Sequence, residues 1–168
     1  MSSILKVDTI QTTAGAAPNA GTLGFSSGHV VQYIPATYAT FSTRFQTTSA
    51  SYGTSGYSLT ITPRSATNLI LISYHLSAYV SSATHYIYSI VHKSTTGSNL
   101  IQTENAVGLG AWSTLSCSAS DVAGTTSPIT YTIYGKASGG TGYLGWSGGG
   151  YVSPSQNFNS FHLMEINT

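Results

Sequence analysis

An alternation of side chains between residues 69 and 80, with an apolar residue at every second position, constrains the fold of this chain more than any other feature. One set of alternate positions carries Ile70, Ile72, Tyr74, Leu76, Ala78 and Val80. The positions between them carry Ser73, His75, Ser77 and Tyr79. A period of two is that of a strand with one buried face, whereas a helix would scatter these apolar residues around its circumference. The segment is therefore predicted to be a half-buried β-strand.

Shorter runs of the same kind recur along the chain, separated by turn-forming residues. They predict further strands at 29–34, 38–46, 57–62, 84–93, 99–103, 112–120, 129–134, 143–146 and 158–167. The small residues 81–83 predict that 69–80 and 84–93 form a hairpin. No ten-residue stretch carries a capped helical apolar stripe. The predicted fold class is all-β, an antiparallel β-sandwich or jelly-roll-like domain.

The charge content of the chain raises the question of whether it folds at all. Charged residues make up 5% of the sequence, against about 25% in a typical soluble domain. Polar, low-complexity chains can remain disordered. Here the net charge is only +1, aromatic residues reach 11%, and the apolar residues cluster into alternating runs. A folded domain is therefore expected.

Composition also bears on partners and compartment. The basic residues are scattered, so no nucleic-acid surface is predicted. No apolar run approaches 18 residues, so no membrane insertion is predicted. Cys117 is the single cysteine, which excludes an internal disulfide and a thiolate zinc site. This pattern suits folding in a reducing cytoplasm.

The amino-terminal residues differ from the rest of the chain. Four apolar side chains fall within seven residues: Ile4, Leu5, Val7 and Ile10. The run is too polar for a signal peptide, and a Gly-, Ala- and Pro-containing stretch follows it. We therefore expect an attachment segment with linker over residues 1–27 and a β-sandwich head domain over 28–168. The four apolar residues are the predicted docking contacts.

The string Ile-Leu-Lys-Val-Asp-Thr-Ile-Gln at residues 4–11 resembles the amino-terminal segment of tailed-phage, cyanophage-like tail-fibre and virion structural proteins. Four later motifs resemble, in order and spacing, the carboxy-terminal β-domain of the same group: Gly28–Gln32, Ser58–Pro63, Asn68–Ile72 and Leu163–Ile166. The resemblance implies a structural protein of the virion, usually a homotrimer. It would be assembled in the host cytoplasm and held by other tail, baseplate or capsid proteins.

Catalytic motifs are weak in this sequence. Residues 140–145 match G-x-G-x-x-G, but the residues that follow cannot form the helix that a dinucleotide site needs. Glycoside hydrolysis requires two facing carboxylates. Only Glu104 and Asp121 could meet near one sheet end, and carboxylates in loops are usually solvated. No enzymatic activity, catalytic residue or cofactor is predicted.

The five histidines lack metal-ligand spacing. His75 could face His85 or His92 across the predicted hairpin, which is more often a hydrogen-bonded surface pair than a metal site. No metal site is predicted within one chain, and an axial ion shared by three copies stays open. Cys117 alternates within a predicted strand and is interpreted as a small core residue.

Aromatic clusters are the best functional candidates. Tyr143, Trp146 and Tyr151 lie among the glycines of the 139–150 region and are the candidate receptor contacts, because rigid aromatic rings bind sugars or proteins at low entropic cost. The alternative is that Trp146 fills the core and the glycines only make turns. A second cluster, Tyr79, Tyr86 and Tyr88, could form an exposed face or a subunit interface.

The function expected from these observations is structural. The chain would be a homotrimeric tail-fibre or tail-tip protein that docks through its amino terminus and presents its β-domain to host-surface glycan. Such display would make weak contacts useful through avidity. The first alternative is a trimeric capsid decoration protein without a receptor role. A carbohydrate-binding module of a secreted enzyme and an enzyme are further alternatives.

Overall fold

The computed structural model describes residues 27–41, 43–82, 84–103, 113–145 and 159–168. Its strands are β1 Val30–Pro35, β2 Phe45–Thr47, β3 Gly53–Ile61, β4 Leu69–Val80, β5 Ile87–Lys93, β6 Ser98–Thr103, β7 Ser113–Val122, β8 Ile129–Ala137, β9 Gly142–Leu144 and β10 Ser160–Ile166. A single turn of 3-10 helix, η1, spans Tyr38–Phe41.

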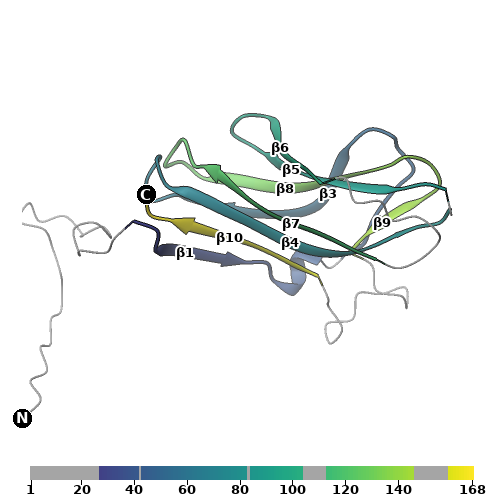
Figure 1. Ribbon diagram of the computed structural model, residues 1–168, viewed down its shortest axis with the longest axis horizontal. Helices are drawn as coiled ribbons and strands as arrows, with labels where there is room; N and C mark the ends of the chain where they lie inside the picture. The colour runs from purple at the N-terminus through teal and green to yellow at the C-terminus, as the bar shows by residue number, and fades with distance from the viewer. Residues whose placement is uncertain (1–26, 42, 83, 104–112, 146–158) are drawn as a thin grey trace, which may run out of the picture.

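The strands form two stacked antiparallel sheets (Figure 1). In sheet A, β4 pairs with β7 along one edge and with β10 and then β9 along the other, while β1 pairs with β10 and β2 with β9. Sheet B has the order β3-β8-β5-β6. When the three-residue strands β2 and β9 are left out, successive strands lie in opposite sheets, apart from β5 and β6. This is the double-sheet jelly-roll arrangement, so the predicted all-β antiparallel sandwich is confirmed.

Two details of the predicted strand layout are wrong. Strands β4 and β5 do not form a hairpin, because β4 belongs to sheet A and β5 to sheet B. Each has an apolar inner face, and alternation alone does not say on which side of the core a strand lies. The predicted strand 38–46 is instead η1 followed by the short β2. Phe41 is buried there and packs edge-on against Tyr57, which turns the chain inward.

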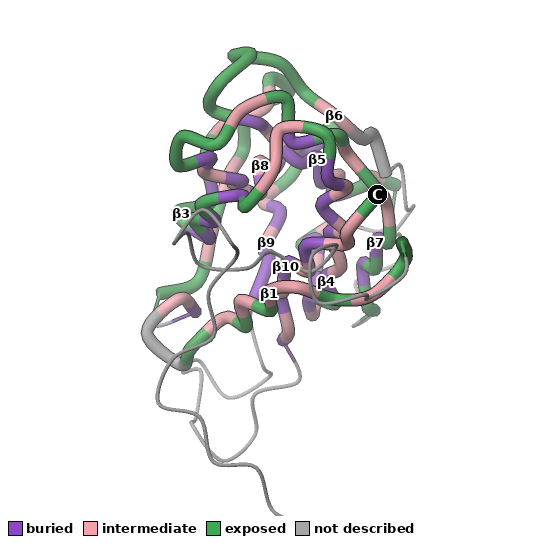
Figure 2. Tube along the Cα trace, turned by 90° about the vertical axis from the view of Figure 1, so that its left-hand side faces the viewer, coloured by how far each residue is buried: buried purple, intermediate pink, exposed green. Residues whose placement is uncertain are grey.

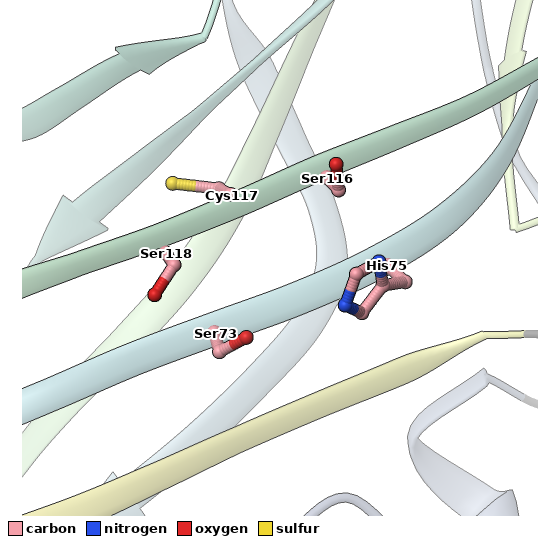
Figure 3. A pocket seen from close by; sticks show the side chains of 5 residues that line it. All are labelled: Ser73, His75, Ser116, Cys117 and Ser118. Carbon is pink, nitrogen blue, oxygen red and sulfur yellow. The ribbon is translucent and has the colours of Figure 1, made fainter.

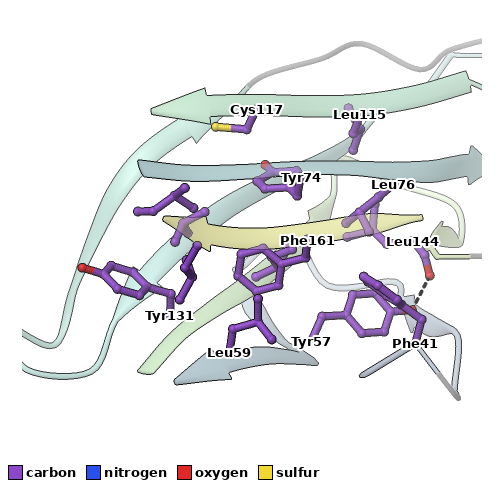
Figure 4. Close-up of a cluster of buried hydrophobic side chains, with 14 of the residues drawn as sticks. Phe41, Tyr57, Leu59, Tyr74, Leu76, Leu115, Cys117, Tyr131, Leu144 and Phe161 are labelled. Carbon is purple, nitrogen blue, oxygen red and sulfur yellow. Dashed lines mark hydrogen bonds between the residues drawn. The ribbon is translucent and has the colours of Figure 1, made fainter. Parts of the chain in front are cut away.

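The core lies between the sheets and is lined by alternate residues of both (Figures 2 and 4). All six apolar positions of the predicted half-buried strand are completely buried in β4. Cys117 is buried as predicted and lies on β7. Three tyrosines are fully buried, and each places its hydroxyl beside a polar partner: Tyr57, Tyr74 and Tyr131. The sandwich therefore has an aromatic core with internal hydrogen bonds.

Tyr57 joins three segments at one end of this core. Its hydroxyl lies 2.9 Å from the carbonyl oxygens of Thr43 and Leu144 and accepts a 3.0 Å hydrogen bond from the backbone N–H of Phe45 (Figure 4). Burial raises the pKa of Tyr57 to about 12, and the hydrogen bond from Phe45 lowers it in part. Burial also raises the pKa of Tyr131, as does the Asp121 carboxylate that accepts its hydrogen bond.

Because the pKa values of these tyrosines are raised in the folded domain, its stability is expected to fall at alkaline pH. The unfolded chain releases the Tyr57 proton near pH 10, whereas the folded chain holds it to about 12. The contribution of Tyr57 is therefore complete below about pH 10 and is lost as the pH rises through about 12. Urea unfolding at a series of alkaline pH values measures this decline, and Tyr57→Phe should make it shallower. Equal slopes for the two proteins would contradict the assignment to Tyr57.

A buried carboxylate connects β10 to β1 and to the loop between β3 and β4. Glu165 is 0% exposed. One of its oxygens accepts hydrogen bonds from the backbone N–H of Arg64 at 2.7 Å and from the side-chain amide of Asn68 at 2.7 Å, and lies 3.4 Å from the N–H of Ser65. Its other oxygen accepts a 2.9 Å bond from the amide of Gln32. Three elements distant in sequence are thus joined at one carboxylate.

A second buried charge connects the two sheets. The Lys93 ammonium on β5 lies 2.7 Å from an Asp121 carboxylate oxygen on β7. It also donates to the carbonyl oxygens of Val122 at 2.8 Å and Ala123 at 3.1 Å. Tyr131 on β8 donates a 2.6 Å hydrogen bond to the same Asp121 oxygen. Asp121, predicted to begin a loop, is therefore a partly buried strand residue with defined partners.

Candidate functional site

The domain has two ends that differ in what they carry. At the base, the N–H of Gly28 donates a 2.7 Å hydrogen bond to the carbonyl of Asn167, so the described chain begins beside its own carboxyl end (Figure 1). At the tip, β9 pairs with the last residues of β4. The ten residue-to-residue steps of β4 from Leu69 at the base to Tyr79 at the tip span roughly 33 Å. Base and tip are therefore separated by nearly the whole length of the sandwich.

A row of outward-facing side chains crosses the tip of sheet A. The strand registers place Gln46 on β2 beside Tyr143 on β9, and Tyr143 beside Tyr79 on β4. The two tyrosine rings are 5.9 Å apart between centroids and tilted by 34°. The Arg44 guanidinium carbon lies 5.3 Å from the Tyr143 ring centroid, and an Arg44 N–H group lies 3.4 Å from the side-chain oxygen of Gln46. We call Arg44, Gln46, Tyr79 and Tyr143 the tip cluster.

Two glycines hold Tyr143 in this position. A side chain at Gly142 would bring its Cβ within 2.6 Å of Ile87, and one at Gly145 would come within 2.2 Å of the Tyr57 hydroxyl. Gly145 also has a φ of +73°, which favours glycine. The backbone of β9 therefore lies close against the core, and the Tyr143 ring between the glycines is directed outward. Three residues of the tip cluster thus lie on strands, and Arg44 directly precedes β2.

Of the receptor contacts predicted from the sequence, one lies in the described part of the chain. Tyr143 lies in the tip cluster, whereas Trp146 and Tyr151 lie outside the described residues. The docking residues Ile4, Leu5, Val7 and Ile10 lie outside them too. Arg44 and Gln46 were missed, because they lie about a hundred residues from Tyr143 and reach it only through the β2–β9 pairing. No local pattern in the sequence signals that pairing.

The predicted second aromatic cluster is divided by the fold. Tyr79 lies in sheet A, whereas Tyr88 lies in sheet B and Tyr86 directly precedes its strand β5; the rings of Tyr86 and Tyr88 have centroids 6.3 Å apart. The Lys136 ammonium lies 4.7 Å from the Tyr88 ring centroid and 4.6 Å from that of Tyr52. The grouping of all three tyrosines is therefore wrong, since it depended on the predicted hairpin.

The histidine pairs expected across that hairpin are not formed either. His75 faces outward from sheet A, and His92 stacks on Tyr134 of sheet B with ring centroids 4.8 Å apart. His85 instead contacts Ser82 and Thr84 through its Nδ1 atom. Among the described residues, no group of three His, Cys, Asp or Glu side chains could hold a metal ion.

A shallow hollow of about 130 Å³ lies on sheet A between β4 and β7 (Figure 3). It is lined by Ser73, His75, Ser116, Cys117 and Ser118. A serine nucleophile needs a base that is oriented by a third group, usually a carboxylate. The two carboxylates in the described part of the chain, Asp121 and Glu165, are bound within the networks at Lys93 and Gln32. The hollow presents serine hydroxyls and the His75 imidazole.

Comparison with known proteins gives only structural matches. No protein-family model matches this chain, and no curated protein matches its sequence. A chain from the structure of the infectious bursal disease virus Gt strain aligns with a TM-score of 0.47 and 11% identity, over 85% of this chain and 39% of that one. A chain of the VP2 subviral particle of the same virus aligns at 0.47 and 14%, over 96% and 41%. This chain thus spans about two fifths of the chains it matches.

Within its described residues, no helix is long and apolar enough to cross a membrane.

Proposed function

We propose that this chain is a non-enzymatic structural protein of a phage virion, a homotrimeric tail-fibre or tail-tip protein that binds host-surface glycan. The observation that carries the proposal is the opposite placement of the two ends. The amino-terminal segment joins the domain at the base, beside Asn167, and the tip cluster lies at the far end of β4. A domain held through Ile4, Leu5, Val7 and Ile10 would therefore present Tyr143 away from the particle.

The contacts between the four β-domain motifs support the resemblance to phage fibre proteins. Its four motifs in the β-domain meet at the base. Gln32 ends the first, Asn68 begins the third, and both donate hydrogen bonds to Glu165 of the fourth. Gln32 also donates a 3.1 Å bond to the carbonyl of Thr62 in the second. Residues that build one buried network have a shared structural reason to occur together, which supports a common domain type.

The tip cluster has the chemistry of a carbohydrate contact. Tyrosine rings offer flat apolar surface for the C–H faces of a sugar ring and lose little side-chain entropy on binding. Arg44 and Gln46 are exposed at their side and carry hydrogen-bonding groups that suit hydroxyls or carboxylates. A single such site binds weakly, and three copies on one particle would raise the apparent affinity.

Replacing Tyr143 with alanine is expected to reduce glycan binding at least about tenfold, because it removes the central ring of the row and the stacking partner of Arg44. Binding is measured on a panel of immobilised bacterial lipopolysaccharides with the full-length protein. Tyr86→Ala is the matched control, since Tyr86 is 39% exposed and its ring lies beside Tyr88 of the other sheet, outside the tip cluster.

Two results would contradict this function. If Tyr143→Ala bound as tightly as the unsubstituted protein, the tip cluster would not be the receptor contact. If the unsubstituted protein bound no polysaccharide and labelled antibodies placed it on the capsid, the capsid decoration alternative would replace the fibre. Loss of binding in the Tyr143 variant alone would support the proposal.

A further inference from the structure

Exposed apolar side chains gather at one place on the described surface. Among the described residues, large hydrophobic side chains are exposed at four positions: Val30 at 49%, Tyr33 at 54%, Tyr86 at 39% and Val122 at 52%. Three of the four lie on the outer face of sheet A at the base, and only Tyr86 lies elsewhere. Contiguous apolar surface of this kind commonly marks a contact with another protein.

The strand registers show that these side chains form continuous rows. Val30 lies beside Ile166, Ile166 beside Leu69, and Leu69 beside Val122. This first row crosses β1, β10, β4 and β7, and it therefore runs from one edge strand of the sheet to the other. A second row behind it contains Tyr33, Met164 and Leu71. We call these seven residues the base band.

The rest of this outer face has few obstacles to close approach. Next to the base band, β4 and β7 present short side chains, at Ser73, Ser116, Ser118 and Ser120. The shallow hollow lies among them (Figure 3). The described outward positions of β1, β10, β4 and β7 include no Asp, Glu, Lys or Arg. Depletion of charge around an apolar centre is typical of protein–protein interfaces.

We propose that the base band is the contact surface between copies of this chain in the homotrimer. This inference rests on the proposed function in one respect, the oligomeric state. The position of the band at the base argues for a second copy as its occupant. The amino-terminal residues 1–26, which lie outside the described part of the chain, connect to the domain at Ser27, three residues before Val30. When three such segments converge on one docking site, the three bases are brought together with them.

The shape of the base band fits a closed ring. In a cyclic trimer, each copy uses two different surface patches to contact its two neighbours. The first row ends at Val30 on the β1 edge and at Val122 on the β7 edge. The β1 edge of one copy therefore meets the β7 edge of the next, and Leu69 and Ile166 lie nearer the axis.

Light scattering coupled to size exclusion tests this surface in the full-length protein. The unsubstituted chain is expected at three times its 17.5 kDa mass. Val30→Lys and Val122→Glu should each reduce it to the single-chain mass, because each places a charge in the apolar contact. Tyr86→Lys is the matched control and should remain trimeric. Circular dichroism and a thermal melt confirm that every variant is folded.

Combining the two substitutions tests the arrangement of edges. If the β1 edge of one copy faces the β7 edge of the next, the double variant Val30→Lys with Val122→Glu should recover part of the trimer, since the two charges then lie opposite each other. A double variant that stays monomeric overturns this edge-to-edge arrangement.

The remaining outcomes separate the surface from the function. If the folded single variants keep the trimeric mass, the copies meet elsewhere and the inference is overturned, while the fibre function stands. A monomer in the unsubstituted protein overturns both this inference and the homotrimeric part of the proposed function. Polysaccharide binding by the Tyr143 variant is a separate measurement at the other end of the domain, so its failure would count against the receptor role alone.

Discussion

Replacing Glu165 with alanine is expected to lower the free energy of unfolding by about 3–5 kcal/mol. The substitution removes a buried carboxylate and with it the acceptor of hydrogen bonds from Arg64, Asn68 and Gln32; of these, Gln32 keeps its bond to the Thr62 carbonyl. Hydrogen bonds to charged groups contribute about 1.5–3 kcal/mol each, and an unsatisfied buried donor costs about 1–3 kcal/mol. Because a domain is stable by only about 5–15 kcal/mol, this is a large share of the total.

A graded series makes the Glu165 experiment specific. Glu165→Gln keeps the shape but loses the charge and turns an NH₂ group toward the donors, so it should fall between the alanine variant and the unsubstituted protein. His162→Ala is the control, since His162 lies on the same strand but on its outer face. Urea unfolding gives the free energy of unfolding of the unsubstituted protein and of each of the three variants. An alanine variant within about 1 kcal/mol of the unsubstituted protein would show that the network contributes little to stability, contrary to the magnitudes above.

Replacing Lys93 with methionine is expected to cost a similar amount, about 3–5 kcal/mol, because it leaves the Asp121 carboxylate without its cationic partner. The side chains of Lys93 and Asp121 are only 6% and 14% exposed, so water screens the pair weakly. The ammonium also fills the space beside the carbonyl oxygens of Val122 and Ala123, which would lose their donor.

A double-mutant cycle separates the pair from its surroundings. Asp121→Asn alone leaves the Lys93 ammonium buried without a full counter-charge and should also be destabilising. The double variant, with methionine at 93 and asparagine at 121, should lose clearly less stability than the sum of the single variants, with a coupling of at least about 1 kcal/mol. Additive losses would mean that the two side chains act independently, despite a separation of 2.7 Å.

Much of the fold could be predicted from the period of the sequence alone. The alternation at 69–80 fixed β4 and its buried face, because a period of two has only one structural explanation over twelve residues. What alternation does not encode is the sheet to which a strand belongs. The false hairpin between β4 and β5 followed from this, and the false grouping of Tyr79 with Tyr86 and Tyr88 followed from the hairpin.

The two buried charges lie at positions where two rules for reading the sequence disagree. Glu165 continues the inward series of Phe161 and Leu163, and Lys93 continues the series of Ile87 and Val91. Their positions in the alternation therefore predict that both side chains point into the core. Their charge argued the opposite, since lone ions are rarely buried. The partners that resolve the conflict come from other strands, and only the folded topology brings them together.

The continuous course of β4 has a mechanical consequence. This single strand reaches from the base, where the amino-terminal segment joins, to Tyr79 at the tip. Its backbone hydrogen bonds to β7 over residues 69–78 and to β10 over 69–75 lie across that direction. A pull between an anchored amino terminus and a tip attached to a cell would enter at β1 and pass to β4 through the hydrogen bonds of β1 with β10 and of β10 with β4. These bonds would then be strained together in shear rather than peeled apart one by one, a geometry that resists tension.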